Sequence, residues 1–351
     1  TKDKFIDIKF QDSYNLIPTK LSGFSSMFNL TSKKEIIPYS LYTQPNIERQ
    51  LINLEECLDY VKNECCYNKD INDEEKIKEV CDLFKKNCED WKCLYNNEVD
   101  IIEYSKQYCF IDVHLLRYGY ETFRKNIDEI SNEKIDIKNY CSLASVALDY
   151  MIINDVFKDC YKICGRPQNF IQKCVVGGRC MTADNKKHHI KGKIQDFDAV
   201  SLYPSAMYKM KGVLKGKPKV LQNNELNENF LMSQDGFFVK AMCLNNPVKN
   251  LHFPLLSKID KNGIRNFTNE TKNEIFHFDK TTYEEVRKYQ NLEFKFICGY
   301  YYNEGHNTKI KDAILHLFKS RLQAKKEKNP IQAVYKLLMN SGYGKCMLKP
   351  I

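Results

Sequence analysis

The sequence contains no long uninterrupted hydrophobic run. Its longest apolar stretch, from Leu143 to Ile153, is broken by Asp149, whereas a helix that crosses a bilayer needs about 20 apolar residues. The N-terminal segment also lacks the basic, apolar and small-residue regions of a secretory signal peptide. These absences predict an intracellular protein of a reducing compartment with no membrane partner, and they leave the organelle or viral factory open.

Cys-x-x-Cys pairs are lacking too, although the chain has 15 cysteines. Six of them crowd the segment 47–95, namely Cys57, Cys65, Cys66, Cys81, Cys88 and Cys93. They do not form two Cys-x-x-Cys pairs, and no histidine follows at zinc-finger spacing. A disulfide framework is not expected in a reducing compartment. We therefore expect buried free thiols, with a zinc site as the alternative.

A strong charge of one sign is absent as well. Hydrophobic residues make up 43% and charged residues 28% of the 351 residues, an ordinary balance for a globular chain of about two domains. The net charge is 54 − 45 = +9. Lysine, asparagine, isoleucine and tyrosine, which have A/T-rich codons, are abundant together. Two explanations of the positive net charge are therefore equally good: the base composition of the gene, and selection for a polyanionic partner.

The character of the chain changes along its length. Helical periodicity dominates up to residue 165, and short strands separated by glycine and proline follow from residue 190, so the predicted fold class is α+β. We predict a strand over 5–10, a helix or loop over 21–28, helices over 47–95, 98–130 and 142–165, a turn at 165–167, strands over 237–241 and 294–297, and helices over 308–328 and 331–342. Within 98–130, one face is expected to hold Ile101, Ile102, Ser105, Cys109, Asp112, Val113 and Leu116.

The segment Asp-Ala-Val-Ser-Leu-Tyr-Pro-Ser, from Asp198 to Ser205, is the most informative for chemistry. It follows an alternating run, which predicts Asp198 at the end of a strand, a tight turn at Pro204 and a helix from Ala206. A carboxylate beside free backbone amides suits a site where a divalent metal ion meets a phosphate. The alternative is a solvated acid before an ordinary turn.

The segment Lys-Leu-Leu-Met-Asn-Ser-Gly-Tyr-Gly-Lys, from Lys336 to Lys345, is the second informative stretch. Lys336, Asn340 and Tyr343 are spaced i, i+4 and i+7, so they share one helical face. A cation, an amide and an aromatic ring together can hold a nucleotide, with the lysine at phosphate and the ring against a base or sugar. The alternative is an ordinary solvated helix face.

The two C-terminal helices are expected to fold back at residues 329–330, because a residue before proline leaves the helical region. At a rise of about 1.5 Å per residue, Lys325 then comes level with Lys336, and Arg321 with Asn340. Three cations gathered on one face indicate a polyanion between them, and a triphosphate fits.

These two segments resemble motif A and motif B of the family B DNA polymerases. Their amino-acid sequences are most similar to those of the protein-primed branch, which includes phage, adenovirus, linear-plasmid and Maverick-type polymerases. The resemblance implies a partial RNase H-like exonuclease domain, a palm built on an antiparallel sheet, and a fingers subdomain that is a helical hairpin.

Two upstream segments support this resemblance. The stretch from Tyr108 to Asp112 resembles the third exonuclease motif, whose aspartate ligates a metal ion. The stretch 176–179 resembles the Tyr-x-Gly-Gly loop between exonuclease and polymerase domains, with Val175 in place of the family's tyrosine. DNA contacts are thereby implied for Gly177, Gly178 and Arg179.

The resemblance also implies roles around motif A. Asp198 would ligate both catalytic magnesium ions (Mg²⁺) of a two-metal mechanism. The backbone amides of Ser201 and Leu202 would touch the triphosphate. Tyr203 would lie under the deoxyribose and exclude a 2′-hydroxyl.

The resemblance implies roles for the residues of motif B and of the exonuclease motif as well. The phosphates of the incoming deoxynucleoside triphosphate would be held by Arg321, Lys325 and Lys336, and the pocket around the nascent base pair would be shaped by Asn340 and Tyr343. Asp112, with Tyr108, would serve metal-dependent 3′–5′ proofreading. The implied partners are primer–template DNA, deoxynucleoside triphosphates and a terminal protein as primer.

The expected domain division follows the motifs. Residues 1–165 would be a partial 3′–5′ exonuclease-like domain, 166–190 a linker with the Gly-Gly loop, 191–305 the first part of the palm, and 306–345 the fingers. The sequence starts at Thr1, and the family's motif C, Tyr-x-Asp-x-Asp-Ser, and its first two exonuclease motifs occur nowhere in it. We therefore expect an internal piece of a polymerase, inactive by itself, without motif C or the thumb.

Three functional classes compete. The first is a piece of a DNA-directed DNA polymerase that acts in replication by nucleotidyl transfer, with protein priming. The second is a truncated or decayed remnant that only binds nucleic acid or a partner. Neutral decay would not selectively spare Asp198, Tyr203, Lys336 and Asn340, so these residues favour the first class. The third, a purely structural helical protein, has no support in residues 190–345.

Overall fold

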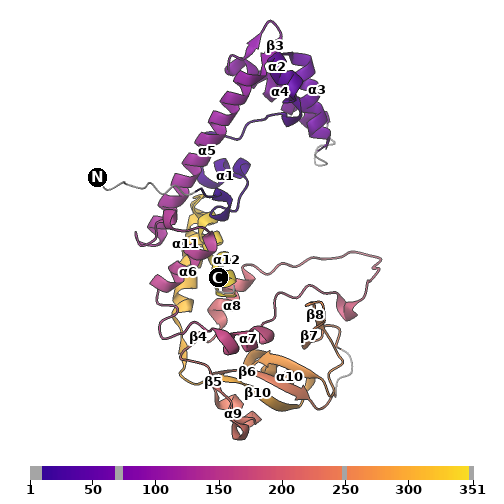
Figure 1. Ribbon diagram of the computed structural model, residues 1–351, viewed down its shortest axis with the longest axis vertical. Helices are drawn as coiled ribbons and strands as arrows, with labels where there is room; N and C mark the ends of the chain where they lie inside the picture. Colours follow the sequence, from indigo (N-terminus) through magenta and orange to yellow (C-terminus); the bar gives the residue numbers. More distant parts are fainter. Residues whose placement is uncertain (1–9, 68–73, 247–250, 348–351) are drawn as a thin grey trace, which may run out of the picture. The chain divides into compact units, whose positions relative to one another are not determined.

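The structure is a computed structural model that describes residues 10–67, 74–246 and 251–347. Its contacts divide the chain into two compact units, residues 1–150 with 317–351 and residues 151–316. Figure 1 follows the chain from its indigo N-terminal part to its yellow C-terminal helices. The strand expected over 5–10 lies, except for Phe10, outside the described residues, and Phe10 is in no strand.

The first unit is mainly helical. Its helices are α1 (Phe24–Phe28), α2 (Gln44–Arg49), α3 (Leu54–Tyr67), α4 (Glu74–Asp90), α5 (Ile101–Ile130) and α12 (Gln332–Met347). Helix α6 (Leu143–Ile153) begins in the first unit and ends in the second, and α11 (Lys309–Lys326) begins in the second and ends in the first. A small antiparallel sheet has the order β1-β3-β2, with β1 (Leu51–Asn53), β2 (Leu94–Tyr95) and β3 (Glu98–Asp100). The helices expected in 47–95, 98–130, 308–328 and 331–342 are confirmed, and the three short strands were not expected.

A compact core joins α3, α4 and the small sheet. Phe84 and Trp91 pack their rings against Tyr104, with ring centroids 4.8 and 4.7 Å apart. Four thiols of the cysteine-rich segment are free and buried in or beside this core, namely Cys57, Cys81, Cys88 and Cys93. The prediction of buried free thiols is confirmed for these four, while the side chains of Cys65 and Cys66 lie outside the described part of the chain.

Helix α5 begins at a well-formed cap but buries a different face from the expected one. The carboxylate of Asp100 accepts hydrogen bonds from the amides of Ile102 and Glu103, at 3.1 and 3.0 Å, which satisfies two of the unpaired donors at the helix start. Its buried residues are Ile101, Tyr104, Tyr108, Leu115, Gly119, Phe123, Ile127 and Ile130. Val113 and Leu116 are exposed instead. The expected face was therefore wrong: apolar residues surround this helix, and its packing partners decide which of them are buried.

Two boundaries near the end of the first unit also differ from expectation. Helix α6 ends at Ile153 rather than at residue 165, and α7 (Gly165–Cys174) occupies the place of the predicted turn. Pro167 is the third residue of α7. Proline is tolerated in the first turn of a helix, because the amide that it lacks has no partner there in any case. The signal interpreted as a turn was a helix start.

The second unit is built on an antiparallel sheet. Its helices are α7, α8 (Leu202–Lys209), α9 (Glu228–Ser233) and α10 (Lys280–Gln290). Its strands are β4 (Val213–Leu214), β5 (Lys219–Val220), β6 (Gly236–Cys243), β7 (Ser257–Ile259), β8 (Arg265–Phe267), β9 (Ile275–Asp279), β10 (Phe294–Tyr302) and β11 (His306–Asn307). The main sheet has the order β5-β10-β6-β9, and all its pairs are antiparallel. This sheet confirms the α+β class and the two predicted strands.

Helices cover both faces of that sheet. Alternate residues of β6 and β9 enter one core with Tyr283 and Val286 of α10, as the period of two in a strand requires. On the opposite face, Phe170 of α7 meets His277 and Tyr300 edge to face, with ring centroids 5.5 and 5.3 Å apart. Figure 1 shows α7 and α10 at this sheet.

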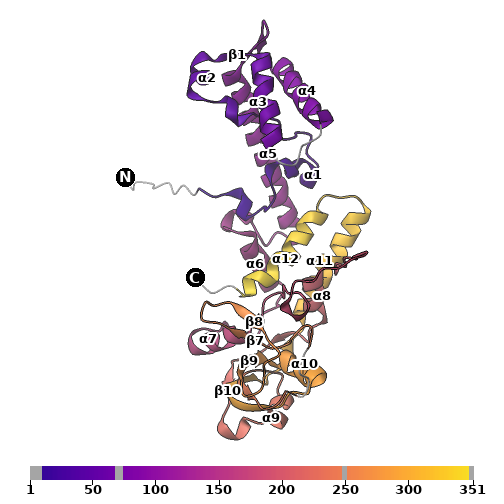
Figure 2. The same cartoon turned by 90° about the vertical axis from the view of Figure 1, so that its right-hand side faces the viewer.

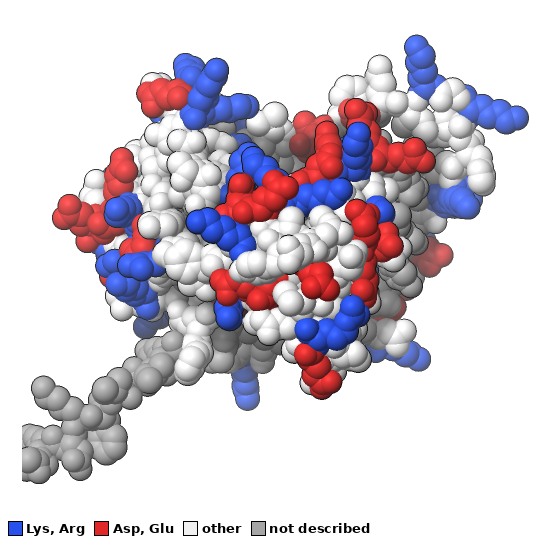
Figure 3. All heavy atoms as spheres, turned by 90° about the horizontal axis from the view of Figure 1, so that it is seen from above, with Lys and Arg blue, Asp and Glu red and all other residues white. Residues whose placement is uncertain are grey.

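The surface carries charges of both signs. Figure 3, seen from above Figure 1, shows lysine and arginine side chains interspersed with aspartate and glutamate over that face. The positive net charge is therefore not gathered into a single basic patch there. Among the described residues, no helix is both long and apolar enough to cross a bilayer.

Candidate active-site segments

The motif A segment is a loop that runs into a helix, and no strand precedes it. Residues 193–199 have no regular secondary structure, so the strand end expected at Asp198 is wrong. Ile194 and Phe197 are 73% and 85% exposed. An alternating pattern stabilises a strand only where a sheet buries one of its sides, and the described residues provide no such sheet here. Asp198 itself is exposed.

Helix α8 begins immediately after this loop, four residues before the expected start. Ser201 precedes it with a left-handed backbone, φ 51° and ψ 48°, and its carbonyl accepts a 2.9 Å hydrogen bond from the amide of Ser205. The amides of Leu202 and Tyr203 precede this first intrahelical hydrogen bond, and the start of a helix carries a partial positive charge. A carboxylate at Asp198 and an anion-binding helix start at Leu202 thus lie close together in sequence.

The Gly-Gly loop meets motif A in the second unit. A Cβ atom at Gly178 would lie 3.1 Å from the hydroxyl oxygen of Tyr203. The absence of a side chain at Gly178 therefore leaves room for the tyrosine ring. Two segments that were predicted separately from the sequence are brought together by this contact.

Arg179, the next residue, is held by backbone carbonyls. Its guanidinium donates to the carbonyl oxygens of Pro254 and Leu255, at 3.0 and 3.2 Å, and lies 4.5 Å from the ring centroid of Phe267. These contacts anchor the Gly-Gly loop next to β7 and β8. The proposed contact of Arg179 with DNA stays a prediction.

The motif B residues lie on a helical hairpin. Figure 2 shows α11 and α12 joined at a bend and running back beside each other. Lys325, Lys336 and Asn340 are exposed, and Arg321 and Tyr343 are partly exposed. The opposite side of the hairpin is apolar and buried through Ala324, Val334, Leu338 and Met339. All five predicted nucleotide-binding side chains thus reach solvent, as a nucleotide surface requires.

The exonuclease-like motif forms a compact polar cluster in the first unit. Lys34 donates a 3.3 Å hydrogen bond to Oδ2 of Asp112 and forms an ion pair with it. The hydroxyl of Tyr108 lies 3.2 Å from that of Tyr39. Burial, followed by the contacts with Tyr39 and Asp112, raises the pKa of Tyr108 above its usual value. A cavity of about 530 Å³ lies beside Lys34 and is also lined by Tyr14 and other residues of the N-terminal segment.

The donor sets for metal ions are incomplete within the described residues. Oδ1 of Asp112 is buried and accepts no hydrogen bond there, so this oxygen is available to a cation. The described part of the chain contains no group of three or more histidine, cysteine, aspartate or glutamate side chains that could hold a metal ion. Asp198 and Asp112 therefore each offer a single carboxylate, and neither belongs to such a group within the described residues.

Sequence reasoning missed some members of these clusters. Lys34 and Tyr39 meet the exonuclease-like motif across 78 and 69 positions of the chain, and no local pattern marks either residue. Asp198 and Tyr203 belong to the second unit, whereas Arg321 and Lys336 belong to the first. The assembly of one site from both sets is a proposal.

The chain is similar to known proteins over its whole length. The family model for DNA polymerase type B, organellar and viral, matches residues 1–351. A protein of Neurospora intermedia described as a probable DNA polymerase is 27% identical over 97% of this chain and 33% of its own length. Another, from Ascobolus immersus, is 30% identical over 59% of this chain and 16% of its own length. The chain thus spans a third or less of these relatives.

Solved structures share its fold. Phi29 DNA polymerase has 16% sequence identity and a TM-score of 0.58, covering 97% of this chain and 48% of the phi29 chain. The phi29 complex with primer–template DNA and incoming nucleotides has 17% identity and a TM-score of 0.56, over 95% and 48%. With the family match over all residues, these findings show that the chain belongs to the organellar and viral type B DNA polymerases.

Proposed function

We propose that this chain supplies the incoming-nucleotide surface and one metal-binding carboxylate of a DNA-directed DNA polymerase that replicates DNA with a protein primer. The observation that carries the proposal is the start of α8. Asp198 lies in an exposed loop four residues before Leu202, where helix α8 begins and its N-terminal end faces an anion most favourably. A metal ion held by the acid and phosphates facing the amides suit a bound nucleoside triphosphate.

The roles of the other residues follow from their surroundings. Tyr203, next to Gly178, would hold its ring against the sugar, and Ser201 and Leu202 would offer backbone amides to the triphosphate. On the hairpin, Arg321, Lys325 and Lys336 would hold the phosphates, and Asn340 and Tyr343 would border the base pair. Bound magnesium would supply charge neutralisation and activate the primer 3′-hydroxyl. The side chains of this chain bind and orient the nucleotide.

The domain roles are part of the same proposal. Residues 1–165 would act in 3′–5′ proofreading through Asp112, whose buried oxygen accepts no hydrogen bond within the described part of the chain. Residues 191–305 would belong to the palm and 306–345 to the fingers. Gly177, Gly178 and Arg179 would lie near primer–template DNA. Two observations support protein priming: the sequences of motifs A and B, and the fold shared with phi29 DNA polymerase.

The test uses the complete polymerase that contains these 351 residues, in template-directed primer extension with magnesium. Asp198→Asn should lower the extension rate by about 100-fold or more, because a metal-binding carboxylate contributes several kcal/mol to transition-state stabilisation. Asp196→Asn is the matched control, since Asp196 is an exposed acid two residues earlier. Absence of extension by the unmodified polymerase would favour a nucleic-acid-binding remnant.

The 351-residue chain alone should neither polymerise nor proofread. Two-metal transfer needs carboxylates on both sides of ions about 3.5–4 Å apart, and the sequence contains no motif C and no acid after Gly344. Weak, salt-sensitive DNA binding should remain through exposed lysines such as Lys209, Lys211 and Lys217. Extension by this chain that disappears with Asp198→Asn would mean that another acid completes the site.

A further inference from the structure

Positive side chains gather on one face of the main sheet in the second unit. Lys240 of β6 and His277 of β9 are direct partners in the antiparallel register, so their side chains are neighbours on the same face. Both are partly exposed, and the residues before and after each of them enter the apolar core on the other side. The face opposite the core thus carries a lysine beside a histidine.

Two more cations reach this face from neighbouring elements. The ring of Phe170 in α7 meets His277 with ring centroids 5.5 Å apart, and Lys173 lies three residues after Phe170, on the same side of the helix. Arg265 of β8 donates a 3.1 Å hydrogen bond to the carbonyl oxygen of Lys173. We call Lys173, Lys240 and Arg265 the basic cluster.

The basic cluster has no acidic partner. Within the described residues, none of its three side chains forms an ion pair, whereas Lys258 of the same unit pairs with Glu274 at 2.7 Å. Asp279, two residues after His277 in β9, accepts a 2.9 Å hydrogen bond from the amide of Thr282 and thereby caps α10. Like charges held together repel, and a bound anion would relieve this repulsion.

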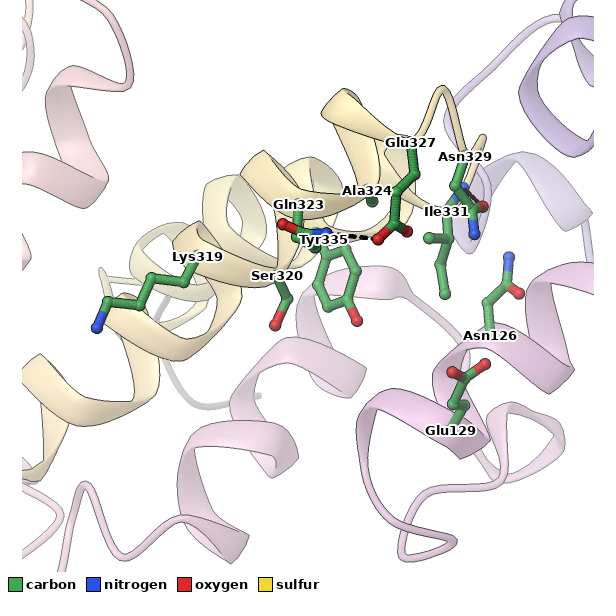
Figure 4. A pocket seen from close by; sticks show the side chains of 10 residues that line it. All are labelled: Asn126, Glu129, Lys319, Ser320, Gln323, Ala324, Glu327, Asn329, Ile331 and Tyr335. Atoms are coloured by element: carbon green, nitrogen blue, oxygen red, sulfur yellow. Dashed lines mark hydrogen bonds between the residues drawn. The ribbon is translucent and has the colours of Figure 1, made fainter.

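A cavity in the first unit has the opposite charge pattern. It has a volume of about 580 Å³, lies between α5 and the α11–α12 hairpin, and is lined by Glu129 and Glu327. Figure 4 shows Glu327 hydrogen-bonded to Gln323, while Lys319 extends away from both carboxylates. An anion is therefore not expected in this cavity.

The arrangement of the basic cluster favours an extended polyanion over a compact one. Its cations come from three separate elements, whereas a compact phosphate typically sits at the start of a helix, and Lys173 is near the end of α7. The guanidinium of Arg265 uses two of its N–H groups for Ser257 and the carbonyl of Lys173. Its other N–H groups make no hydrogen bond within the described residues, and they suit phosphate oxygens.

We propose that the basic cluster binds the sugar–phosphate backbone of primer–template DNA on the α7 face of the main sheet. This inference rests on the proposed function, and it adds a DNA contact to the nucleotide surface and the Gly-Gly loop. Contacts with the backbone carry no sequence information. The cluster therefore holds a duplex in place whatever its sequence.

The test is the affinity of the complete polymerase for primer–template duplexes between about 50 and 200 mM salt. Lys173→Gln and Lys240→Gln each remove one charge from a side chain that reaches solvent. Each should weaken binding about three- to tenfold and lower the slope of log K against log salt by about 1. The double variant should lower the slope by about 2, equally for two duplexes of unrelated sequence.

The controls separate charge from folding. Lys288 is exposed on α10, which packs on the other face of the sheet, so Lys288→Gln should leave the affinity and the slope unchanged. Arg265→Lys keeps the charge, and Arg265→Gln removes it. DNA affinity should follow the charge at residue 265 rather than the melting temperature of the variant.

The pKa of His277 provides a second readout. The charges of the basic cluster, together with burial, lower this pKa, so phosphates bound beside the cluster should raise it. Histidine NMR signals of the labelled 351-residue chain measure the shift on addition of duplex DNA, and His277→Gln identifies the signal. The double lysine variant should show a smaller shift. An unchanged pKa on DNA binding would contradict the proposed site.

The outcomes distinguish this site from the proposed function. Unchanged affinity and slope in the double variant would overturn the basic cluster as a DNA site, while primer extension would still support the polymerase. Loss of binding to polyglutamate at unchanged DNA affinity would assign the cluster to an acidic protein and also overturn the proposal. If the unmodified polymerase neither binds nor extends primer–template DNA, the proposed function fails, and the DNA site fails with it.

Discussion

Tyr203 combines an exposed ring with a restricted hydroxyl. It is the second residue of α8 and is 46% exposed, and its hydroxyl lies where a Cβ at residue 178 would nearly touch it. In the complete polymerase, Tyr203→Val should raise ribonucleotide incorporation about 10- to 200-fold, because a smaller side chain leaves room for a 2′-hydroxyl. Deoxynucleotide use should change little. Single-nucleotide kinetics with both sugars measure this.

The control for this prediction lies on the same helix. Tyr208 is also exposed, and Tyr208→Val should leave sugar discrimination unchanged. Equal discrimination by Tyr203→Val and the unmodified polymerase would remove Tyr203 from sugar selection. Gly178→Ala should alter discrimination as well, since its Cβ would have to displace the tyrosine hydroxyl.

Gly119 illustrates a residue that packing has selected. It lies within α5, and a Cβ there would overlap the ring of Phe24 in α1. Gly119→Ala should therefore destabilise the chain by about 1–3 kcal/mol, as overpacking does, even though alanine is the better helix former by about 1 kcal/mol. Urea unfolding measures the change.

A second helical glycine provides the comparison. Apart from its chain neighbours and the backbone of its own helix, no atom of the described residues lies within 4 Å of a Cβ added at Gly344 in α12. Gly344→Ala should therefore stabilise the chain by up to about 1 kcal/mol. Destabilisation of similar size in both variants would contradict the packing explanation for Gly119.

At the scale of elements, the contact of α7 with the main sheet includes a histidine, His277. Burial, followed by the charges of Lys173, Lys240 and Arg265, lowers the pKa of His277 below its usual value of 6.5. The unfolded chain therefore binds a proton more readily than the folded chain. Stability should fall as the pH decreases below 6.5, down to the folded-state pKa, and this contribution should be constant above 6.5.

Urea unfolding at pH 7.5 and pH 5.5 tests this sign. The unmodified chain should lose more stability on acidification than His277→Gln, which cannot take up the proton. Both proteins contain the same carboxylates, so their common titration cancels in the comparison. Equal losses would show that His277 is not held neutral between α7 and the sheet.

Elements with a strong internal signal were predictable, and those that depend on partners were not. The long helix α5, the strands β6 and β10, and the hairpin helices α11 and α12 follow from periodicity that each segment carries itself. The strand expected before Asp198 had the same kind of alternation but no sheet to pack on. The start of α7 was misjudged because glycine and proline mark turns and helix starts alike.

At the scale of the whole molecule, the second unit is one continuous stretch of chain, whereas the first is made of two. Residues 151–316 contain the main sheet and its apolar core. Expressed alone, this segment should fold and unfold in one cooperative urea transition, because its hydrophobic cluster is complete within it.

Residues 1–150 alone should be less stable than in the full chain. They lack α12, which packs against α5 and contributes the buried Val334, Leu338 and Met339. Adding residues 317–351 through a short linker should restore stability, with urea midpoints as the measurement. A fully stable 1–150 segment, or an unfolded 151–316 segment, would contradict this division.

The sequence by itself determined the motifs, most of the helices and the two long strands. Asp198, Tyr203, Lys336 and Asn340 are recognisable because the chemistry and the spacing of side chains are local properties. Membership of the family B DNA polymerases can be inferred from these residues, and the match of the family model to residues 1–351 confirms it.

Only the tertiary structure decided which faces are buried and which distant residues meet. The ion pair of Lys34 with Asp112 joins residues 78 positions apart, and the ring contact of Phe170 with His277 joins α7 to β9. An apolar or polar pattern indicates what a segment can bury or bind, but the free energy of each contact depends on the segment that packs against it. That partner is supplied by segments far away in the chain, whose position no local pattern contains.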